Sequence, residues 1–466
     1  MILVGWFVSR RKKGGEAFLM GGRRLSLALM LGTVTATLVG TGSSMGAVGY
    51  GYQNGWGGAL YGIGGGFGIV LLTLLFSSIR KYNFMTMTEE IAFYYGANRT
   101  LKSVTSIILY LASIGWLGAH ILGGSFYLSW ISGVNLLTCK LITAAGFGLY
   151  VIIGGYLAVV WTDTIQSVIL FLGFIIMAIF AVPAAGGFEL IRASVPAENL
   201  SFLGTGKSGW IPALSLAVSI AAGALSVPSY RQRIYSARTI AVVRKSFYIS
   251  AVAYFFFSIL PVIIGLSAYT INPNLENNNM AFPFMATAVL PTVLGAIVLI
   301  SGLSATISSG DSDALTGVTI LLRDVWVVFT GEVPEGKSVV RISRWTLFAS
   351  IGLAFSFGFF AEDILGYISK MISTLMSGIC VTVILGRLWK RATWQGALAA
   401  LITGSTVSIV VMSIPSFSDF WGNPILPSLG IAALAHTFTS LATPRQVLAE
   451  KQVLAIINGE RRAMDI

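Results

Sequence analysis

Apolar residues along this chain gather into long runs that short polar stretches separate. Residues 25–79 contain no charged side chain, and residues 103–162 contain only Lys140. A helix needs roughly 20 apolar residues to cross the hydrocarbon core of a bilayer. Each of these runs is therefore long enough for two spanning helices, and the pattern predicts an all-α integral membrane protein.

The same pattern, followed to the end of the chain, predicts about twelve spanning helices. They cover residues 26–50, 56–79, 103–130, 139–158, 163–185, 209–229, 246–270, 284–322, 345–361, 364–386, 395–415 and 424–442. The apolar start, residues 1–8, is too short to span and reads as the end of a truncated N-terminal helix. It runs into basic residues without a small-residue cleavage site, so we expect no signal peptide.

The positions of the basic residues agree with this count. If residues 9–24 face the cytoplasm and the chain then alternates, 26 of the 30 lysines and arginines fall in cytoplasmic segments. The four exceptions are Lys140, Arg192, Lys207 and Lys370. Cytoplasmic loops of membrane proteins carry such an excess, and one extra or missing span would reverse the later loops. The net charge of +12 therefore indicates membrane topology rather than nucleic-acid binding.

Composition excludes several classes of site. Charged residues are 10% of the chain, against about 25% in soluble domains. Two cysteines, Cys139 and Cys380, predict neither a disulfide framework nor a metal cluster. Two histidines, His120 and His436, share no metal-ligand spacing, and we expect both to be ordinary helix residues. Paired carboxylates and nucleophile motifs are also missing, so the sequence does not indicate an enzyme.

Glycine and hydroxyl residues coincide inside the first predicted span. Residues 40–46 read Gly-Thr-Gly-Ser-Ser-Met-Gly. Glycine costs about 1 kcal/mol in a helix interior relative to alanine, and interrupted helices hold substrates and ions in many transporters. The segment therefore predicts an unwound stretch, with close helix packing by small residues as the alternative. A weaker break is predicted near Gly223, before Pro228.

Carboxylates and serines occur in apolar surroundings at two places. Asp163 starts the fifth predicted span, where it is either functional or a helix-start residue favoured by the helix dipole. In the eighth span Ser308 and Asp311 share a helix face. Sodium is a hard cation that prefers oxygen ligands, although Ser308 and Ser309 have back-bonding to their own helix as an alternative. We expect Asp313 to lie near the cytoplasmic end of this helix, facing water.

Four segments resemble the solute:sodium symporter family. They are residues 18–23 (Phe-Leu-Met-Gly-Gly-Arg), residues 154–166 around Trp-Thr-Asp-Thr-Ile-Gln, the pair Gln232-Arg233, and residues 304–311. The resemblance implies a LeuT-type fold, in which two inverted repeats of five helices precede additional C-terminal helices. The twelve predicted spans divide accordingly into ten plus two.

The resemblance also implies a sodium site between the first and eighth core helices. Its ligands map to the carbonyls of Ala36, Val39 and Ala305 and to the hydroxyls of Ser308 and Ser309. Sodium is the expected cofactor.

Some family members carry a second sodium site, which maps to Asp163, Asp311 and Ser312. The glycine-rich first helix is most similar to the choline-transporter branch, so sugar-binding residues do not transfer. The expected substrate-binding residues are Gly40, Thr41, Gly42, Ser43, Ser44 and Trp116.

The sequence thus predicts sodium-coupled symport of a small hydrophilic organic solute by alternating access. The solute is an amino acid, a monocarboxylate, a sugar or a quaternary amine. Residues 1–466 form one domain, with a remnant helix and basic loop (1–24), a ten-helix core (25–386) and two additional helices with a tail (387–466). The expected partners are solute, sodium and the bilayer of a bacterial or archaeal cell membrane, with no nucleic acid and no obligatory protein. A proton-coupled or uncoupled carrier is the alternative, ahead of a channel or a sensor.

Overall fold

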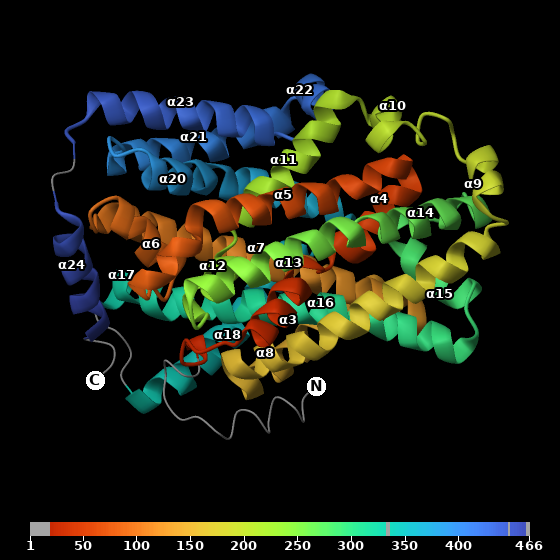
Figure 1. Cartoon of the computed structure of the whole chain (residues 1–466), viewed down its shortest axis with the longest axis horizontal. Helices are drawn as coiled ribbons and strands as arrows, with labels where there is room; N and C mark the ends of the chain where they lie inside the picture. Colours follow the sequence, from red (N-terminus) through yellow and green to blue (C-terminus); the bar gives the residue numbers. More distant parts are fainter. Residues whose placement is uncertain (1–18, 332–335, 446–447, 463–466) are drawn as a thin grey trace.

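The computed structural model describes residues 19–331, 336–445 and 448–462. Within them the chain is helical and contains no β-strand, only an isolated bridge between Leu25 and Ala237. The long helices run side by side across Figure 1, with α24 lying across their left-hand ends and α9 and α10 at the opposite end. The all-helical prediction is confirmed, while the predicted helix remnant at 1–8 lies outside the described residues.

The long helices are α3 (Leu27–Leu38), α4 (Ala47–Asn54), α5 (Ala59–Phe76), α7 (Arg99–Ser132), α8 (Leu136–Ala184), α11 (Trp210–Ser226), α12 (Pro228–Ser236), α13 (Ile240–Phe257), α14 (Ile259–Ile271), α16 (Thr292–Ile320), α18 (Gly336–Gly358), α19 (Ile364–Met371), α20 (Ser377–Leu388), α21 (Trp394–Ser413) and α23 (Ile425–Ala442). Shorter helices connect them: η1 (Gly42–Gly46), η2 (Gly55–Gly58), η3 (Ser77–Tyr82), α6 (Met87–Tyr94), α9 (Phe188–Ser194), η4 (Phe202–Gly204), α10 (Thr205–Ser208), η5 (Asn278–Met280), α15 (Ala281–Ala288), η6 (Leu321–Val325), α17 (Trp326–Thr330), η7 (Ile372–Met376), α22 (Pro415–Trp421) and α24 (Glu450–Arg462).

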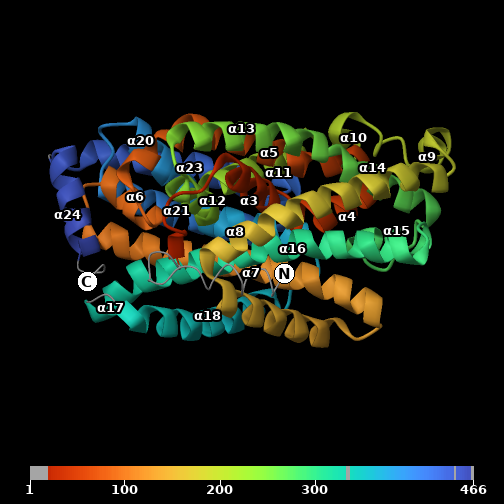
Figure 2. The same cartoon turned by 60° about the horizontal axis from the view of Figure 1, so that its bottom comes forward.

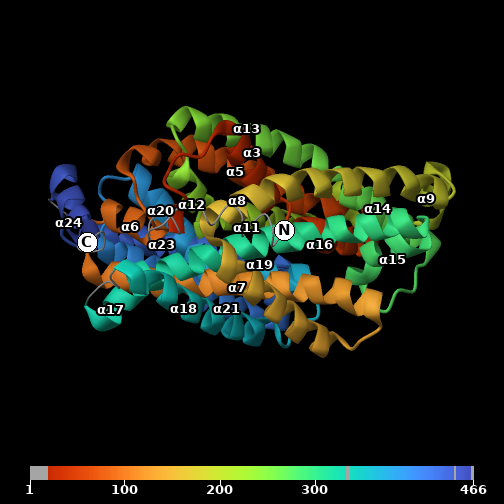
Figure 3. The ribbon, with the colours of Figure 1, turned by 90° about the horizontal axis from the view of Figure 1, so that it is seen from below.

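All twelve predicted spans coincide with helices. By length and composition, eight helices among the described residues can cross a membrane, or nine if the bent pair α11–α12 is one span. The other three predicted spans coincide with α3 and its break, with the short apolar helix Leu136–Gly148, and with α18. Figures 2 and 3 show α18 beside α7, and it packs against α7 and α8.

Two predicted span boundaries are wrong. The loop expected at 159–162 is helical, and the chain instead breaks at Gly155, where φ is 62° and ψ is 178°. That conformation is essentially restricted to glycine, so the turn occurs where the sequence permits it. The predicted span 284–322 is two elements, because Pro291 caps a new helix that begins at Thr292 and leaves α15 separate.

The predicted break in the sixth span is confirmed. α11 and α12 meet at Val227 and are bent by 43°. Pro228 begins α12, where its missing N–H leaves no unpaired donor, and it drives the preceding residue out of the helical region. The bend turns α12 toward the interior, where all nine of its residues are buried.

Glycines let α5 and α11 approach backbone to backbone. A methyl group built on Gly64 would lie 2.3 Å from the carbonyl oxygen of Ala217, and one on Gly68 would lie 2.9 Å from the Cα of Ala221. Small residues allow such close packing in membranes, where dispersion contacts hold helices together. Close helix packing by small residues, which was the alternative considered for residues 40–46, therefore describes the glycines of α5.

We predict that Gly64→Ala lowers the stability of the purified protein by about 1–3 kcal/mol, because its methyl group meets backbone that cannot move aside. The matched control is Gly430→Ala in α23, where an added methyl group meets nothing within 4 Å. This control should be neutral or gain up to about 1 kcal/mol from helix propensity. Thermal unfolding in detergent measures both, and equal melting temperatures for the two variants would contradict the packing argument.

Candidate functional site

The first spanning segment unwinds at the glycines that the sequence singled out. α3 ends at Leu38, and the chain resumes as a single π-helical turn at Gly42. Ser43 Oγ donates to the Leu38 carbonyl at 2.9 Å, and Ser44 Oγ donates to the Gly40 carbonyl at 2.7 Å. The Ser43 hydroxyl thus satisfies the Leu38 carbonyl, which a continuous helix would have paired, as backbone inside a membrane protein requires. The Gly40 carbonyl also accepts from the Ser44 N–H at 3.1 Å.

The serine pair of α16 lies against the last turn of α3. Ser308 Oγ and Ser309 Oγ each donate to the Ala36 carbonyl at 3.3 Å. Ser309 Oγ is also 3.4 Å from the Thr37 carbonyl, and Ser308 Oγ is 3.2 Å from the Ala305 carbonyl of its own helix. All five residues are buried. Hydroxyl and carbonyl oxygens from two helices therefore converge in one small volume.

Val39 is the remaining predicted ligand. It is buried, and its N–H donates to the Thr35 carbonyl at 3.1 Å as the cap of α3. Among the described residues, no hydrogen bond joins the Val39 carbonyl to the serine pair. The oxygen cluster carries no formal charge, which suits a monovalent hard cation better than a transition metal. The part of the chain that the structure describes contains no group of three His, Cys, Asp or Glu that could hold a metal ion.

Asp163 is bound by an arginine that the sequence-based site did not include. Its Oδ2 accepts from Thr33 Oγ1 at 2.6 Å and from Arg233 Nη2 at 3.2 Å. Arg233 Nη2 also donates to Ser312 Oγ at 2.5 Å, and both charged side chains are fully buried. Asp163 lies two turns beyond the break at Gly155, so the reading as a helix-start residue is wrong.

Asp311 takes no part in this ion pair. Its side chain is fully buried, and neither carboxyl oxygen has a hydrogen-bond partner among the described residues. Asp163 and Ser312 are thus joined by the guanidinium of Arg233 and by a direct contact, in which Ser312 Oγ donates to Asp163 Oδ2 at 3.5 Å, while Asp311 remains outside the hydrogen-bonded group. The guanidinium already supplies the positive charge that a second sodium ion would bring to Asp163.

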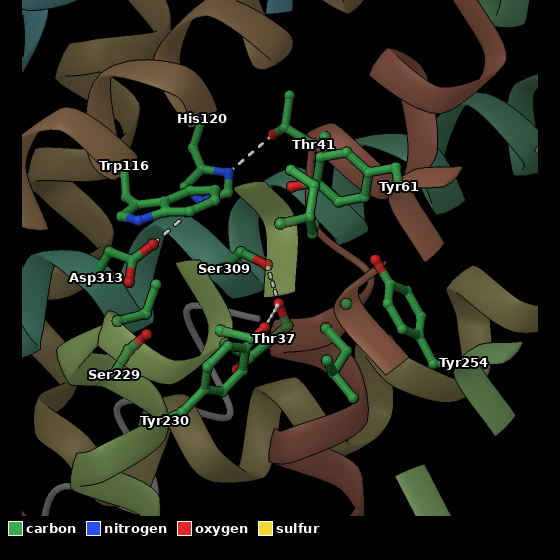
Figure 4. A pocket seen from close by; sticks show the side chains of 17 residues that line it. Thr37, Thr41, Tyr61, Trp116, His120, Ser229, Tyr230, Tyr254, Ser309 and Asp313 are labelled. Carbon is green, nitrogen blue, oxygen red and sulfur yellow. Dashed lines mark hydrogen bonds and ion pairs between the residues drawn. The ribbon is translucent and has the colours of Figure 1, made fainter. Parts of the chain in front are cut away.

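A cavity of about 40 Å³ lies beside the serine pair, between the unwound segment and α5, α7, α11, α12, α13 and α16, and we call it the pocket (Figure 4). Four of the expected substrate-binding residues line it, namely Gly40, Thr41, Gly42 and Trp116. Ser43 and Ser44 do not, because their hydroxyls are turned to the backbone of the break. Seven further polar or aromatic lining residues were not predicted: Thr37, Tyr61, His120, Ser229, Tyr230, Tyr254 and Asp313.

His120 and Asp313 form a buried pair in the pocket wall. His120 Nε2 lies 3.2 Å from Asp313 Oδ2, and Nδ1 lies 2.8 Å from Thr41 Oγ1 (Figure 4). The Trp116 ring stacks on the imidazole, with centroids 6.4 Å apart and planes at 24°.

The sequence-based reading of Asp313 is therefore wrong. Asp313 does not face water, because the apolar helix continues past it to Thr330 and leaves the residue only 5% exposed. His120 lies within α7, and its contacts with Thr41 and Asp313 in the pocket wall were not predicted. The sequence did contain a signal for His120. It is an ionisable side chain in an uncharged span, and it lies four residues after Trp116 and hence on the same helix face.

The chain resembles known transporters along nearly its whole length. The model of the sodium:solute symporter family matches residues 18–404. The sodium/pantothenate symporter of Haemophilus influenzae is 23% identical over 445 residues, covering 91% of this chain and 90% of that protein. The sodium/pantothenate symporter of Escherichia coli is 24% identical over 454 residues, covering 93% and 92%.

Solved structures show the same architecture. A Na⁺-coupled sialic acid symporter in a substrate-bound outward-open state matches with a TM-score of 0.81 and 18% identity, covering 96% of both chains. Mhp1, a nucleobase-cation-symport-1 family transporter in a closed conformation, matches with a TM-score of 0.60 and 14% identity, covering 94% of this chain and 98% of that one. These similarities confirm the LeuT-type fold.

The buried ion pair yields a stability prediction. Asp163→Leu should destabilise the protein by about 3–5 kcal/mol, because it leaves the guanidinium of Arg233 buried without a counter-charge. The double variant Asp163→Leu/Arg233→Met should be considerably more stable than this single variant, since it removes both charges. Thermal unfolding in detergent measures the difference. A double variant no more stable than Asp163→Leu would show that the two side chains are not energetically coupled.

Proposed function

The chain belongs to the sodium:solute symporter family, and from this premise we propose that its sodium ion binds where α3 meets α16. The ligands are the carbonyls of Ala36 and Ala305 and the hydroxyls of Ser308 and Ser309, with the Val39 carbonyl as the fifth. The observation that carries this proposal is that both serine hydroxyls lie within 3.3 Å of the Ala36 carbonyl, in a buried and uncharged setting. Each hydroxyl has lone pairs that a cation can use once its hydrogen turns away.

The protein is a sodium-coupled secondary transporter, and its solute occupies the pocket beside this ion site. Ser309 and Thr37 contribute to both places, since both line the pocket and both belong to the oxygen cluster. An ion that joins the broken helix to α16 therefore fixes one wall of the pocket. Coupling is reciprocal, so sodium raises solute affinity by the factor by which solute raises sodium affinity, typically about 1–3 kcal/mol.

Alternating access then moves the ion and the solute together. Both sites lie at interruptions of spanning helices, which is where this class of fold changes shape. The membrane potential adds about 2.3 kcal/mol per charge per 100 mV to inward movement of the sodium ion. Asp163 has Arg233 as its counter-charge, so one sodium ion rather than two accompanies the solute.

The same premise sets the cellular context. This is a multi-pass membrane protein, and the bilayer we propose is the plasma or inner membrane of a bacterium or archaeon. Residues 1–466 act as one polytopic domain, in which 25–386 form the transporting core. Sodium, solute and lipid are sufficient partners for this activity.

Replacing Ser308 and Ser309 by alanine tests the ion site without knowledge of the solute. Loss of two oxygen ligands should raise the sodium concentration for half-maximal thermal stabilisation at least about tenfold. The measurement is a melting curve of purified protein in sodium chloride, with potassium chloride holding ionic strength constant. Ser301→Ala is the control, because Ser301 is buried on the same helix and its hydroxyl donates to the Val298 carbonyl. An unchanged sodium midpoint in the double variant would remove the serine pair from the ion site.

A further inference from the structure

A second hollow lies at the far end of the molecule from α24. Its volume is about 530 Å³, and η2, α9, α14 and the loop that follows α9 line it. Figures 1 and 2 show α9 beside α14 at this end, which is external in the topology that the basic residues predict. The hollow shares no lining residue with the pocket. We call it the outer hollow, and sodium-coupled transport leaves it without a role.

The outer hollow extends from the membrane interface into the hydrocarbon layer. The span Gly155–Ala184 has 30 residues and is about 45 Å long, whereas the hydrocarbon core is about 30 Å thick. Its external end therefore reaches the headgroup region, and α9 begins just beyond that end, at Phe188. Leu266 and Ile263 belong to the span that ends at Ile271 and lie about 8 Å and 12 Å before its end.

The surroundings of the outer hollow expose large apolar side chains. Phe188 in its lining is 63% exposed, and Leu190 of the same helix is 50% exposed. Phe202 and Trp210, which follow in the same external connection, are 71% and 67% exposed. Exposed apolar groups that gather in this way mark contact with a membrane, and aromatic side chains are enriched at its interface. The mouth of the hollow therefore faces lipid.

Arg192 is the one charged residue in the lining of the outer hollow. It is exposed, and it makes no hydrogen bond or ion pair with another described residue. Glu189 is three residues away on the same helix, a spacing that permits a pair, and Glu198 is paired instead with Lys207 at 3.8 Å. Basic residues are scarce in the predicted external segments. A cation without a counter-charge thus lies at the rim of an apolar hollow.

We propose that the outer hollow binds one anionic glycerophospholipid, with its phosphate at Arg192 and an acyl chain against Ile263 and Leu266. A guanidinium matches the oxygens of a phosphate with two parallel hydrogen bonds. The acyl chain gains shape fit rather than hydrophobic energy, because the bilayer it leaves is equally apolar. The charge of the headgroup therefore decides which lipid binds.

Other occupants fit the outer hollow less well. A water-soluble anion would find one exposed arginine among apolar side chains, and a single exposed ion pair is weak. A zwitterionic lipid carries a cationic group close to its phosphate, which Arg192 repels. An uncharged amphiphile would leave Arg192 without a counter-charge. The volume of about 530 Å³ is within the range of sites that enclose small molecules.

The position of this lipid gives it a structural effect on the broken first span. Trp56 in the lining belongs to η2, which directly follows α4, and α4 packs backbone to backbone on α14. A methyl group built on Gly265 of α14 would lie 2.5 Å from the Val48 carbonyl oxygen of α4. A lipid held between η2, α9 and α14 therefore supports the external half of the first span. The proposal does not depend on the sodium site.

Counting bound lipids tests the headgroup contact. The purified full chain is titrated in detergent with phosphatidylglycerol or phosphatidylcholine, and native mass spectrometry gives the affinity of the first lipid bound. Phosphatidylglycerol should bind about fivefold tighter than phosphatidylcholine, and Arg192→Gln should remove this preference. Lys207→Gln is the control, because it removes the same charge from the same external connection outside the hollow. The preference should persist in this control. Equal affinities of the two lipids in the wild type, or equal effects of the two variants, would overturn the proposal.

Filling the hollow tests the contact with the acyl chain. Ala197 is an exposed lining residue, so Ala197→Phe occupies part of the hollow without disturbing the core, and phosphatidylglycerol affinity should fall at least about threefold. Ala193→Phe is the matched control, because Ala193 is exposed on α9 but does not line the hollow. Equal affinities in these two variants would contradict binding in the hollow. Glycerol 3-phosphate, which has the phosphate but no acyl chain, should not displace the lipid at millimolar concentration. Displacement would show a site for soluble phosphates instead.

Discussion

Everything described at the centre of this protein depends on backbone carbonyls that a break in α3 leaves without helical partners. Inside a membrane such groups must find hydrogen bonds or ligands within the protein. Here the Ser43 hydroxyl donates to the Leu38 carbonyl, and the serine pair of α16 donates to the Ala36 carbonyl in the last turn of α3. One structural defect therefore supplies the oxygen ligands, the contact between two helices and one wall of the pocket.

Buried charged side chains also need partners within the protein, and leaving them unpaired costs more free energy than leaving a carbonyl unpaired. Desolvating an ion costs several kcal/mol unless a counter-charge lies beside it. Arg233 pairs with Asp163, and Arg231 pairs with Glu90 at 3.6 Å while its guanidinium lies over the Phe76 ring. Both arginines come from α12, the short helix that the bend at Pro228 directs into the protein interior. A helix break thus positions the counter-charges, just as another break positions the ion ligands.

The pocket joins these two systems to the solute. Thr41, in the unwound segment, contacts His120 of α7 and Thr306 of α16 through one hydroxyl. Any movement of the unwound segment relative to α16 must therefore alter the ion ligands and the His120–Asp313 pair together. That shared wall is the physical reason why the proposed sodium and solute sites would influence each other.

The sequence alone determined the membrane class, the broken first helix and the serine pair. Uninterrupted apolar runs, clustered glycines and isolated hydroxyls each have an energetic effect that depends on residues close by in the chain, so the sequence is enough to recognise it. It also singled out Trp116 and Thr41, which line the pocket. Only the tertiary structure decided the partners of Asp163 and Asp313, and it leaves Asp311 without a hydrogen-bond partner among the described residues. Arg233 lies 70 residues from Asp163 and His120 lies 193 residues from Asp313, so no spacing in the chain links them. The environment of a buried charge is set by which helices pack together, and periodicity within one helix carries no information about its neighbours.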